Sequence, residues 1–257
     1  MSIRACRSLV VLVSVILSGA VAAGQGKAPP QPVSDRDHRE ALKFFRAGQE
    51  QYARERFEPA AEQFRLAVGR DPLLDLAHYS LGQSYMQLGR FVEAADAYKG
   101  CIEAERTLHT LAESNQFAAE RRRDDDIREL KEIVDRLASD PRTAKSPRIL
   151  QLQARVDDLQ RQRAVVGSAF QPPAEVLLAL GSAYFRTGLF DQAEFEWKAA
   201  AAASPKLGEA HNNLAALYMR AGRLEDAAAS LTRAEESGFH VNPQFKQDLE
   251  NRRRTSR

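Results

Sequence analysis

The chain of 257 residues repeats itself. Four similar segments of 34 residues occur in two adjacent pairs: 41–74, 75–108, 174–207 and 208–241. Within each segment, apolar residues recur every three or four positions over two stretches, which predicts two amphipathic α-helices. Turn residues separate the two stretches: Glu55, Gly89, Gly188 and Gly222. A repeat of this length predicts a stack of helix pairs in which each pair buries its apolar face against its neighbours.

A small residue on the first helix of each repeat is matched by a large residue on the second helix, as two closely crossing helices require. The small residues are Gly48, Gly82, Gly181 and Ala215, and the large residues are Phe64, Tyr98, Trp197 and Leu231. Pro72 and Pro205 stand where their repeats end, because proline blocks helix continuation. Cys101 takes the position of an alanine in the other repeats, so we expect a buried packing residue and not a reactive thiol.

At these positions the sequence resembles the tetratricopeptide repeat family. The third repeat carries the family pattern most completely, through Leu177, Leu180, Gly181, Tyr184, Ala193, Trp197 and Pro205. The resemblance implies an all-α fold, a right-handed superhelical solenoid of helix-turn-helix pairs. It assigns residues 37–106 to a first pair of repeats and residues 171–241 to a second pair.

The resemblance also implies a peptide-binding groove lined by the first helix of each repeat. The expected groove residues are Phe45, Gln49, Tyr52, Tyr79, Gln83, Met86, Phe185, Arg186, Asn212, Met219 and Arg220. Aromatic, amide and methionine side chains suit adaptable contact with an extended or helical peptide. Arg186, Asn212 and Arg220 form a hypothetical site for an acidic group of that ligand. The Lys, Arg and Asn set with which some family members hold a C-terminal carboxylate is not reproduced.

Residues 107–170 interrupt the repeats and predict a helical hairpin. The chain from Cys101 to Asp140 contains neither glycine nor proline, which predicts one long helix, and Asp140-Pro141 ends it. Ser146 and Pro147 then start a second helix. Each helix carries an apolar stripe: Ile127, Leu130, Val134 and Leu137 on the first, and Ile149, Leu152, Val156 and Leu159 on the second. Two interpretations stay open: the hairpin packs on its neighbours, or it projects and mediates partner contact or dimerisation.

No arrangement of residues indicates catalysis, a cofactor or a metal site. The five histidines are scattered, no Cys-x-x-Cys occurs, and no glycine-rich loop follows a strand. His78 and His211 share one repeat position, so we expect both to be packing residues. The charged run 121–126 places Arg121 near Asp125 and Arg122 near Asp126 along one helix, which predicts ion pairs on a solvated face.

The two ends of the chain are predicted to lie outside the repeats. Residues 1–23 combine Arg4 and Arg7 with a short apolar run and small residues at Ala22 and Ala23, the pattern of a signal peptide cleaved near these alanines. An uncleaved N-terminal anchor is the alternative. Residues 24–36 predict a flexible linker. Residues 242–257 predict a capping helix, with Phe245 and Leu249 inward, and a basic tail.

Charge narrows the choice of partner. The net charge of +2 comes from the predicted signal peptide, so the remaining chain is neutral and a general electrostatic grip on nucleic acid or anionic membrane is not expected. The sequence therefore predicts an exported, periplasmic or secreted scaffold that binds a protein or peptide partner and is not an enzyme. The alternative is a helical spacer or oligomerisation module of an envelope assembly, built on residues 107–167.

Overall fold

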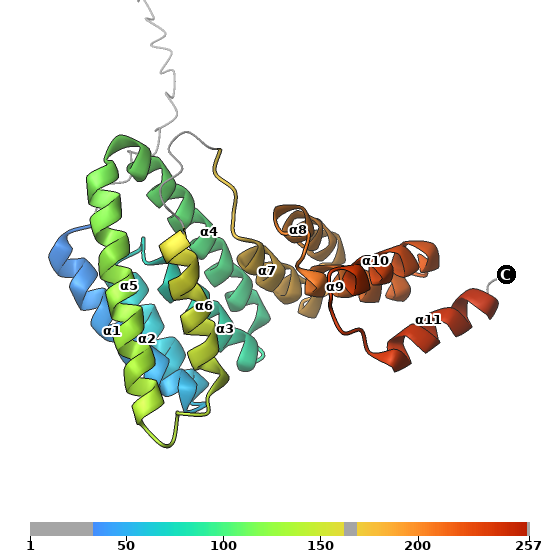
Figure 1. The fold of residues 1–257 in the computed structure, drawn as a ribbon, viewed down its shortest axis with the longest axis horizontal. Helices are drawn as coiled ribbons and strands as arrows, with labels where there is room; N and C mark the ends of the chain where they lie inside the picture. Colours follow the sequence, from blue (N-terminus) through green and yellow to red (C-terminus); the bar gives the residue numbers. More distant parts are fainter. Residues whose placement is uncertain (1–32, 162–168, 256–257) are drawn as a thin grey trace, which may run out of the picture. The chain divides into compact units, whose positions relative to one another are not determined.

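A computed structural model describes residues 33–161 and 169–255, and these residues form helices and no strands (Figure 1). The helices are α1 Asp35–Ala53, α2 Phe57–Arg70, α3 Asp75–Gln87, α4 Phe91–Ser114, α5 Gln116–Ser139, α6 Pro147–Arg161, α7 Ala174–Arg186, α8 Phe190–Ala203, α9 Gly208–Arg220, α10 Leu224–Glu236 and α11 Pro243–Thr255. The predicted all-α repeat fold is confirmed, with α1–α2, α3–α4, α7–α8 and α9–α10 as the four helix pairs.

The predicted match of small and large residues holds each pair together. A Cβ atom added to Gly48 would lie 2.5 Å from the ring of Phe64, and one added to Gly82 would lie 2.5 Å from the ring of Tyr98. Carbon atoms do not approach this closely, so both positions require glycine. The turns also follow the repeat, because Glu55 has φ 58°, in the left-handed region that Gly89 adopts at the same repeat position.

The stack of repeats continues across the insertion. Helix α4 packs directly against α7, and their interface buries residues from both helices: Ala94, Ala95, Tyr98 and Cys101 from α4, and Val176, Leu180 and Ala183 from α7. The same arginine–aromatic contact occurs here and between repeats 3 and 4, so α4 and α7 pack as the helices of successive repeats do. Arg186 lies 4.3 Å from the ring centre of Phe91, and Arg220 lies 4.7 Å from that of Phe190, one repeat further on.

The predicted single long helix is wrong, because the chain breaks at Asn115. Helix α4 runs on to Ser114, and α5 begins at Gln116. Asn115 has φ −150° and ψ 80°, and its side-chain oxygen accepts a hydrogen bond from the backbone N–H of Ala118. An asparagine that caps the following helix can therefore end a helix where neither glycine nor proline is present. The stop at Asp140 and the start at Pro147 are as predicted.

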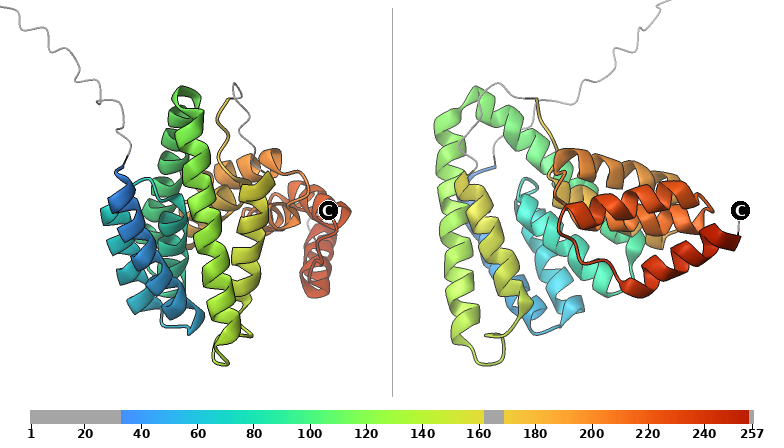
Figure 2. Two further views of the ribbon diagram at one scale, coloured as in Figure 1. Left: turned by 60° about the vertical axis from the view of Figure 1, so that its left-hand side comes forward. Right: turned by 45° about the vertical axis from the view of Figure 1, so that its right-hand side comes forward.

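The hairpin formed by α5 and α6 packs on the first two repeats. In Figures 1 and 2 the two helices lie side by side along α1 and α3. Its apolar stripes enter the same core as Leu42 and Phe45 of α1: Leu130, Ile133, Val134, Leu137, Leu152, Val156 and Leu159 are all buried there. A buried leucine contributes about 1.5–3 kcal/mol through the hydrophobic effect. The first of the two interpretations, a hairpin packed on its neighbours, therefore describes the structure.

Both ends of the repeat region have defined caps. Ser34 caps α1 by accepting a hydrogen bond from the N–H of Asp37, so Asp35 and Arg36, assigned above to a linker, are helical. At the other end α11 packs against α10 and buries Leu249, as predicted.

No helix within the described ranges is long and apolar enough to cross a membrane. Residues 1–32, with the predicted signal peptide and most of the linker, lie outside the described residues.

Candidate ligand site

The structure divides the expected groove residues into two sets. In repeats 1 and 2 the hairpin covers the face that the first helices present, and Phe45 and Gln49 are completely buried. The other members of this set are half-buried: Tyr52, Tyr79, Gln83 and Met86. The chain's own α6 therefore occupies the surface on which a peptide was expected.

Arg148, at the start of α6, makes the central contact on this face. Its Nε donates to Gln49 Oε1 over 2.6 Å, and its Nη2 donates to Ser80 Oγ over 2.8 Å. Its Nη1 donates to the side-chain oxygens of Gln83 and Gln151. Arg148 is 4% exposed, and burial lowers the pKa of its guanidinium. Every polar contact that the described residues make with it comes from a neutral group, so its positive charge has no counter-ion.

Arg148 also stacks on an aromatic ring. Its guanidinium carbon lies 4.7 Å from the centre of the Tyr52 ring, within the range of a cation–π interaction. This contact and the ring of amide and hydroxyl acceptors satisfy the guanidinium without neutralising it. A buried cation held in this way remains attractive to an anion that can reach it.

A second arginine of α6 lies two turns further along in an acidic environment. Arg155 Nη2 lies 2.6 Å from Asp75 Oδ2 of α3 and 3.2 Å from Glu105 Oε1 of α4, and its Nη1 lies 2.8 Å from Asp158 Oδ2. Burial, together with the nearby charge of Asp75, raises the pKa of Glu105 to about 8. Three carboxyl groups thus contact one guanidinium, and the raised pKa of Glu105 keeps its carboxyl group mostly protonated at neutral pH.

Between these two arginines lies a pocket of about 360 Å³. Helices α3, α4, α6 and the start of α7 form its walls, and both Arg148 and Arg155 line it. Apolar side chains make up much of the remaining surface, among them Leu76, Leu152 and Val176. The pocket exists because the hairpin closes over the first-helix face, since α6 supplies one whole wall.

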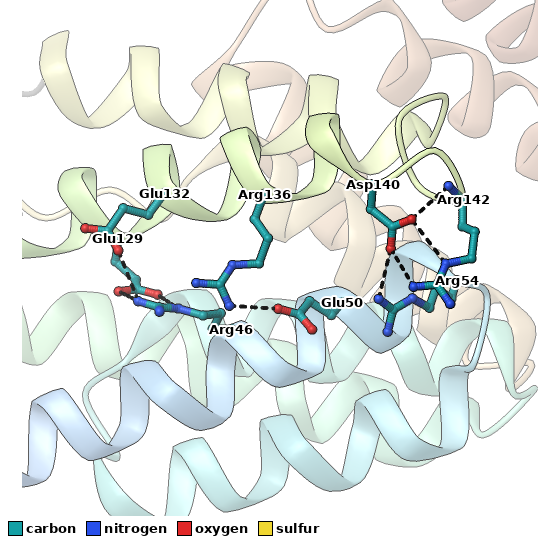
Figure 3. Close-up of polar contacts among 8 residues, drawn as sticks. All are labelled: Arg46, Glu50, Arg54, Glu129, Glu132, Arg136, Asp140 and Arg142. Atoms are coloured by element: carbon teal, nitrogen blue, oxygen red, sulfur yellow. Dashed lines mark hydrogen bonds and ion pairs between the residues drawn. The ribbon is translucent and has the colours of Figure 1, made fainter.

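Ion pairs between α1 and α5 fix the hairpin in place (Figure 3). Arg46 makes a bidentate contact with Glu129, with two nitrogen–oxygen distances of 2.6 Å. The other pairs drawn are Arg46–Glu132, Arg136–Glu50 and Arg54–Asp140, together with Arg142–Asp140 within the turn that follows α5. Because the Arg46–Glu129 pair is largely buried and bidentate, it sets the register between the two helices more firmly than exposed pairs do.

A buried cluster of four charged groups joins the other ends of α1 and α5. His38 Nδ1 lies 2.7 Å from Asp71 Oδ2, and His38 Nε2 lies 3.4 Å from Asp126 Oδ1. Arg122 Nη2 lies 2.6 Å from the same oxygen of Asp71. The prediction that Arg122 pairs with Asp126 on a solvated face is therefore wrong for these two residues, because they face α1 and the α2–α3 turn. Burial opposes protonation of His38, but its close contacts with the carboxylates of Asp126 and Asp71 raise its pKa to about 9.

The second set of expected groove residues, in repeats 3 and 4, is not covered by the hairpin. Phe185 and Asn212 are half-buried, Arg186 and Arg220 are exposed, and Met219 is buried. The guanidinium groups of Arg186 and Arg220 lie over the aromatic rings of Phe91 and Phe190. The hypothetical acidic-group site thus consists of two stacked guanidinium groups and one amide on successive first helices.

Sequence reasoning missed both arginines of α6. Arg148 and Arg155 follow the same helical spacing as Leu152 and Leu159, so they fall on the buried stripe itself. The signal that could have found them is a charged residue at the helical spacing of a buried apolar stripe.

His78 behaves as predicted, because its ring packs on Gly100 and its Nε2 contacts the carbonyl oxygen of Pro72 at 3.0 Å. Within the described residues, no group of three or more His, Cys, Asp or Glu side chains is arranged so that it could hold a metal ion.

These features define a class of protein, an array of stacked helix pairs. The sequence profile described as "Tetratricopeptide repeat" matches residues 45–106 and 172–239, together just over half of the chain. The chain therefore belongs to the tetratricopeptide repeat family. Proteins of this family are scaffolds for protein–protein interaction and are generally not catalytic.

Crystal structures of other repeat proteins resemble the fold. TTC0263, a thermophilic TPR protein of Thermus thermophilus, is 21% identical, with 82% of this chain and 98% of that chain covered and a TM-score of 0.34. YrrB, described as a TPR protein with an unusual peptide-binding site, is 15% identical, with coverage of 84% and 94% and a TM-score of 0.30. Pseudomonas aeruginosa PilF is 17% identical, with coverage of 81% of each chain and a TM-score of 0.32. No curated protein sequence matches the chain.

Proposed function

We propose that the chain is an exported, non-catalytic adaptor that binds a protein or peptide partner on the first-helix face of repeats 3 and 4. One observation carries the proposal. The hairpin buries Phe45 and Gln49 in repeats 1 and 2, whereas the equivalent face of repeats 3 and 4 keeps Asn212 accessible and Arg186 and Arg220 exposed. Family membership supports an interaction role, and the uncovered face supports this location.

The chemistry of this face favours a partner segment with an acidic group. Two guanidinium groups held on aromatic rings are pre-positioned, so less side-chain entropy is lost when a carboxylate binds. Phe185, which is half-buried on α7, supplies apolar contact beside the charges. An acidic, partly apolar peptide segment satisfies both features.

Site-specific photo-crosslinking in the native host tests the location. A crosslinking residue at Asn212 should form adducts with a defined partner, and one at Phe195 should not. Phe195 is a matched control because it is 70% exposed but lies on α8, a second helix. Adducts from Phe195 and none from Asn212 would place the partner on the opposite face and contradict the proposal.

A double substitution tests the two arginines. Arg186→Ala with Arg220→Ala should weaken binding of the crosslinked partner at least about tenfold, the loss of roughly 1.4 kcal/mol. Arg223→Ala is the control, because Arg223 also stacks on an aromatic ring, that of Tyr218, but lies in the turn after α9. Equal binding by the double variant and the control would remove the two arginines from the interface.

Export to the periplasm or outside the cell is the second part of the proposal. It is supported by the basic and apolar pattern of residues 1–23 and by the small residues before Gly24. Cell fractionation with mass spectrometry of the N-terminus should find the chain in the envelope or the medium, beginning just after Ala22 or Ala23. An intact Met1 on an envelope-bound chain would instead support the uncleaved anchor, and a cytosolic chain would contradict export.

A further inference from the structure

Two hydrogen-bond donors in the wall of the hairpin pocket have no acceptor. The guanidinium of Arg148 has five N–H groups, and the hydrogen bonds described above use four of them. The fifth, on Nη2, has no acceptor among the described residues. Tyr79 of α3 lines the same pocket, and its hydroxyl group makes no hydrogen bond within the described part of the chain. Unsatisfied donors in a pocket wall indicate a ligand that brings acceptor atoms.

The charge of Arg148 makes an anion the favoured acceptor. Arg148 is buried and only neutral groups contact it, so an anion that enters the pocket supplies the missing counter-ion where water screens the attraction weakly. Burial raises the pKa of Tyr79 to about 12, and the nearby charge of Arg148 opposes this rise only in part. The Tyr79 hydroxyl therefore keeps its proton at neutral pH and can donate it to the same anion.

The other charged groups of the pocket limit the ligand to one negative charge. Arg155 engages the carboxylates of Asp75 and Asp158, roughly 10 Å from Arg148 along the axis of α6. Glu105 is mostly protonated at neutral pH, as its raised pKa requires. The remaining two charged residues of the lining are exposed and of opposite sign: Arg161 and Glu175. Arginines and ionised carboxylates of the lining are thus equal in number, so the second charge of a dianion would find no partner.

The rest of the wall favours an apolar body for the ligand. Leu76, Leu152 and Val176 form part of the lining and offer neither donors nor acceptors. A peptide laid against them would bury backbone N–H and C=O groups without partners, which is costly, whereas a hydrocarbon loses nothing there. The volume of about 360 Å³ lies at the small end of the range for small-molecule sites.

We propose that the hairpin pocket binds a small monocarboxylate with an apolar body, such as a fatty acid of about eight carbons, whose carboxylate accepts hydrogen bonds from Arg148 and Tyr79. An extended chain gains roughly 1.2 Å per bond, so eight carbons reach about as far as the distance from Arg148 to Arg155 along α6. The ligand site is separate from the face of repeats 3 and 4, and the protein partner proposed there does not depend on it.

Calorimetric titration of the full chain at pH 7 tests the class of ligand. Octanoate should bind, and 1-octanol, which lacks the charge, should bind at least about tenfold more weakly. Butyrate should also bind at least about tenfold more weakly, because each buried methylene contributes about fourfold in affinity. No heat with octanoate at millimolar concentration, or equal affinity for octanol, would overturn the proposal. Binding of trialanine as tight as that of octanoate would assign the pocket to peptides and overturn it as well.

Substitutions test the two donors. Tyr79→Phe removes one hydroxyl group and keeps the ring, so it should weaken octanoate binding about tenfold and leave octanol binding unchanged. Tyr52→Phe is the matched control, because Tyr52 stacks on Arg148 but does not line the pocket. Equal octanoate affinity of these two variants would remove the Tyr79 hydroxyl from the site.

Arg148→Gln should abolish the preference for octanoate over octanol, and its melting temperature shows whether the fold survives the change. A folded Arg148→Gln variant that still prefers octanoate would mean that the carboxylate does not lie at Arg148, and the proposed site would be wrong. If this variant does not fold, the comparison of Tyr79→Phe with Tyr52→Phe still decides the question.

Discussion

Single residues set how closely the helices of each repeat approach. Gly82 is the clearest case, since the ring of Tyr98 fills the space that any side chain would need. The sequence identified this contact, because the same small and large residues recur with the repeat period. It also identified the turn at Glu55, because the three other repeats have glycine at this position. Glu55 itself adopts φ 58°, in the left-handed region. Repetition turns a weak local pattern into a strong prediction.

Gly82→Ala should lower the free energy of unfolding by about 1–3 kcal/mol, because the new methyl group forces Tyr98 and its neighbours to shift. Gly69 provides the matched control. It lies inside α2 with nothing within 4 Å of an added Cβ, so Gly69→Ala should raise stability by up to about 1 kcal/mol through helix propensity. Urea unfolding of both variants measures the difference. A loss of stability in Gly69→Ala as large as that in Gly82→Ala would contradict the packing argument.

The helical hairpin shows where sequence reasoning stops at the scale of elements. The apolar stripes of α5 and α6 were visible, but a stripe shows that a face is buried and not which surface buries it. The partner of that face depends on contacts between residues far apart in sequence, such as Arg46 with Glu129 and Arg148 with Gln49. The break at Asn115 was missed for a different reason, because an asparagine cap competes with a helix only when tertiary packing favours the bend.

The charged cluster around His38 makes attachment of the hairpin depend on pH. The pKa of His38 is raised from 6.5 to about 9, so the folded state binds the proton more tightly than the unfolded state. This stabilisation is complete below about pH 6.5 and is lost as the pH rises to about 9, an effect of up to about 3 kcal/mol. The free energy of unfolding should therefore fall across this range, as urea unfolding at several pH values would show.

The variant His38→Gln isolates this contribution. Glu105, whose pKa is raised to about 8, makes stability fall with pH in the same direction, so the informative quantity is the difference between the wild type and the variant. The decline with pH should be shallower in His38→Gln, and it should be unchanged in His240→Gln, where the histidine is exposed. Parallel curves for the wild type and His38→Gln would show that the cluster does not hold a protonated histidine.

At the scale of the whole molecule, the described repeats share one stack but have separate main cores. Repeats 1 and 2 form one core with the hairpin, repeats 3 and 4 form another with α11, and a smaller cluster between α4 and α7 joins them. Sequence predicted the repeats on both sides of the insertion. The pattern of apolar residues could not show that repeat 2 packs directly on repeat 3, because the insertion separates these two repeats along the chain.

Leu180→Ala should destabilise the α4–α7 interface more than it destabilises the core of repeats 1 and 2 or the core of repeats 3 and 4. Leu180 is 2% exposed at the α4–α7 interface, and removing its side chain should cost about 2–5 kcal/mol and separate unfolding into two transitions. Leu189→Ala, at a position 43% exposed in the following turn, should leave a single transition. Calorimetry distinguishes the two outcomes. A single transition for Leu180→Ala would mean that the two cores remain coupled through other contacts.

The direct packing of α4 on α7 has a mechanical consequence. If a partner and an anchor pulled on opposite ends of the repeats, the load would pass across this interface and bypass the hairpin. Rupture of the interface would then expose residues 115–173 to tension, and the segment would extend by up to roughly 200 Å at about 3.3–3.6 Å per residue. The insertion would thus act as a reserve of chain length that is released only under strain.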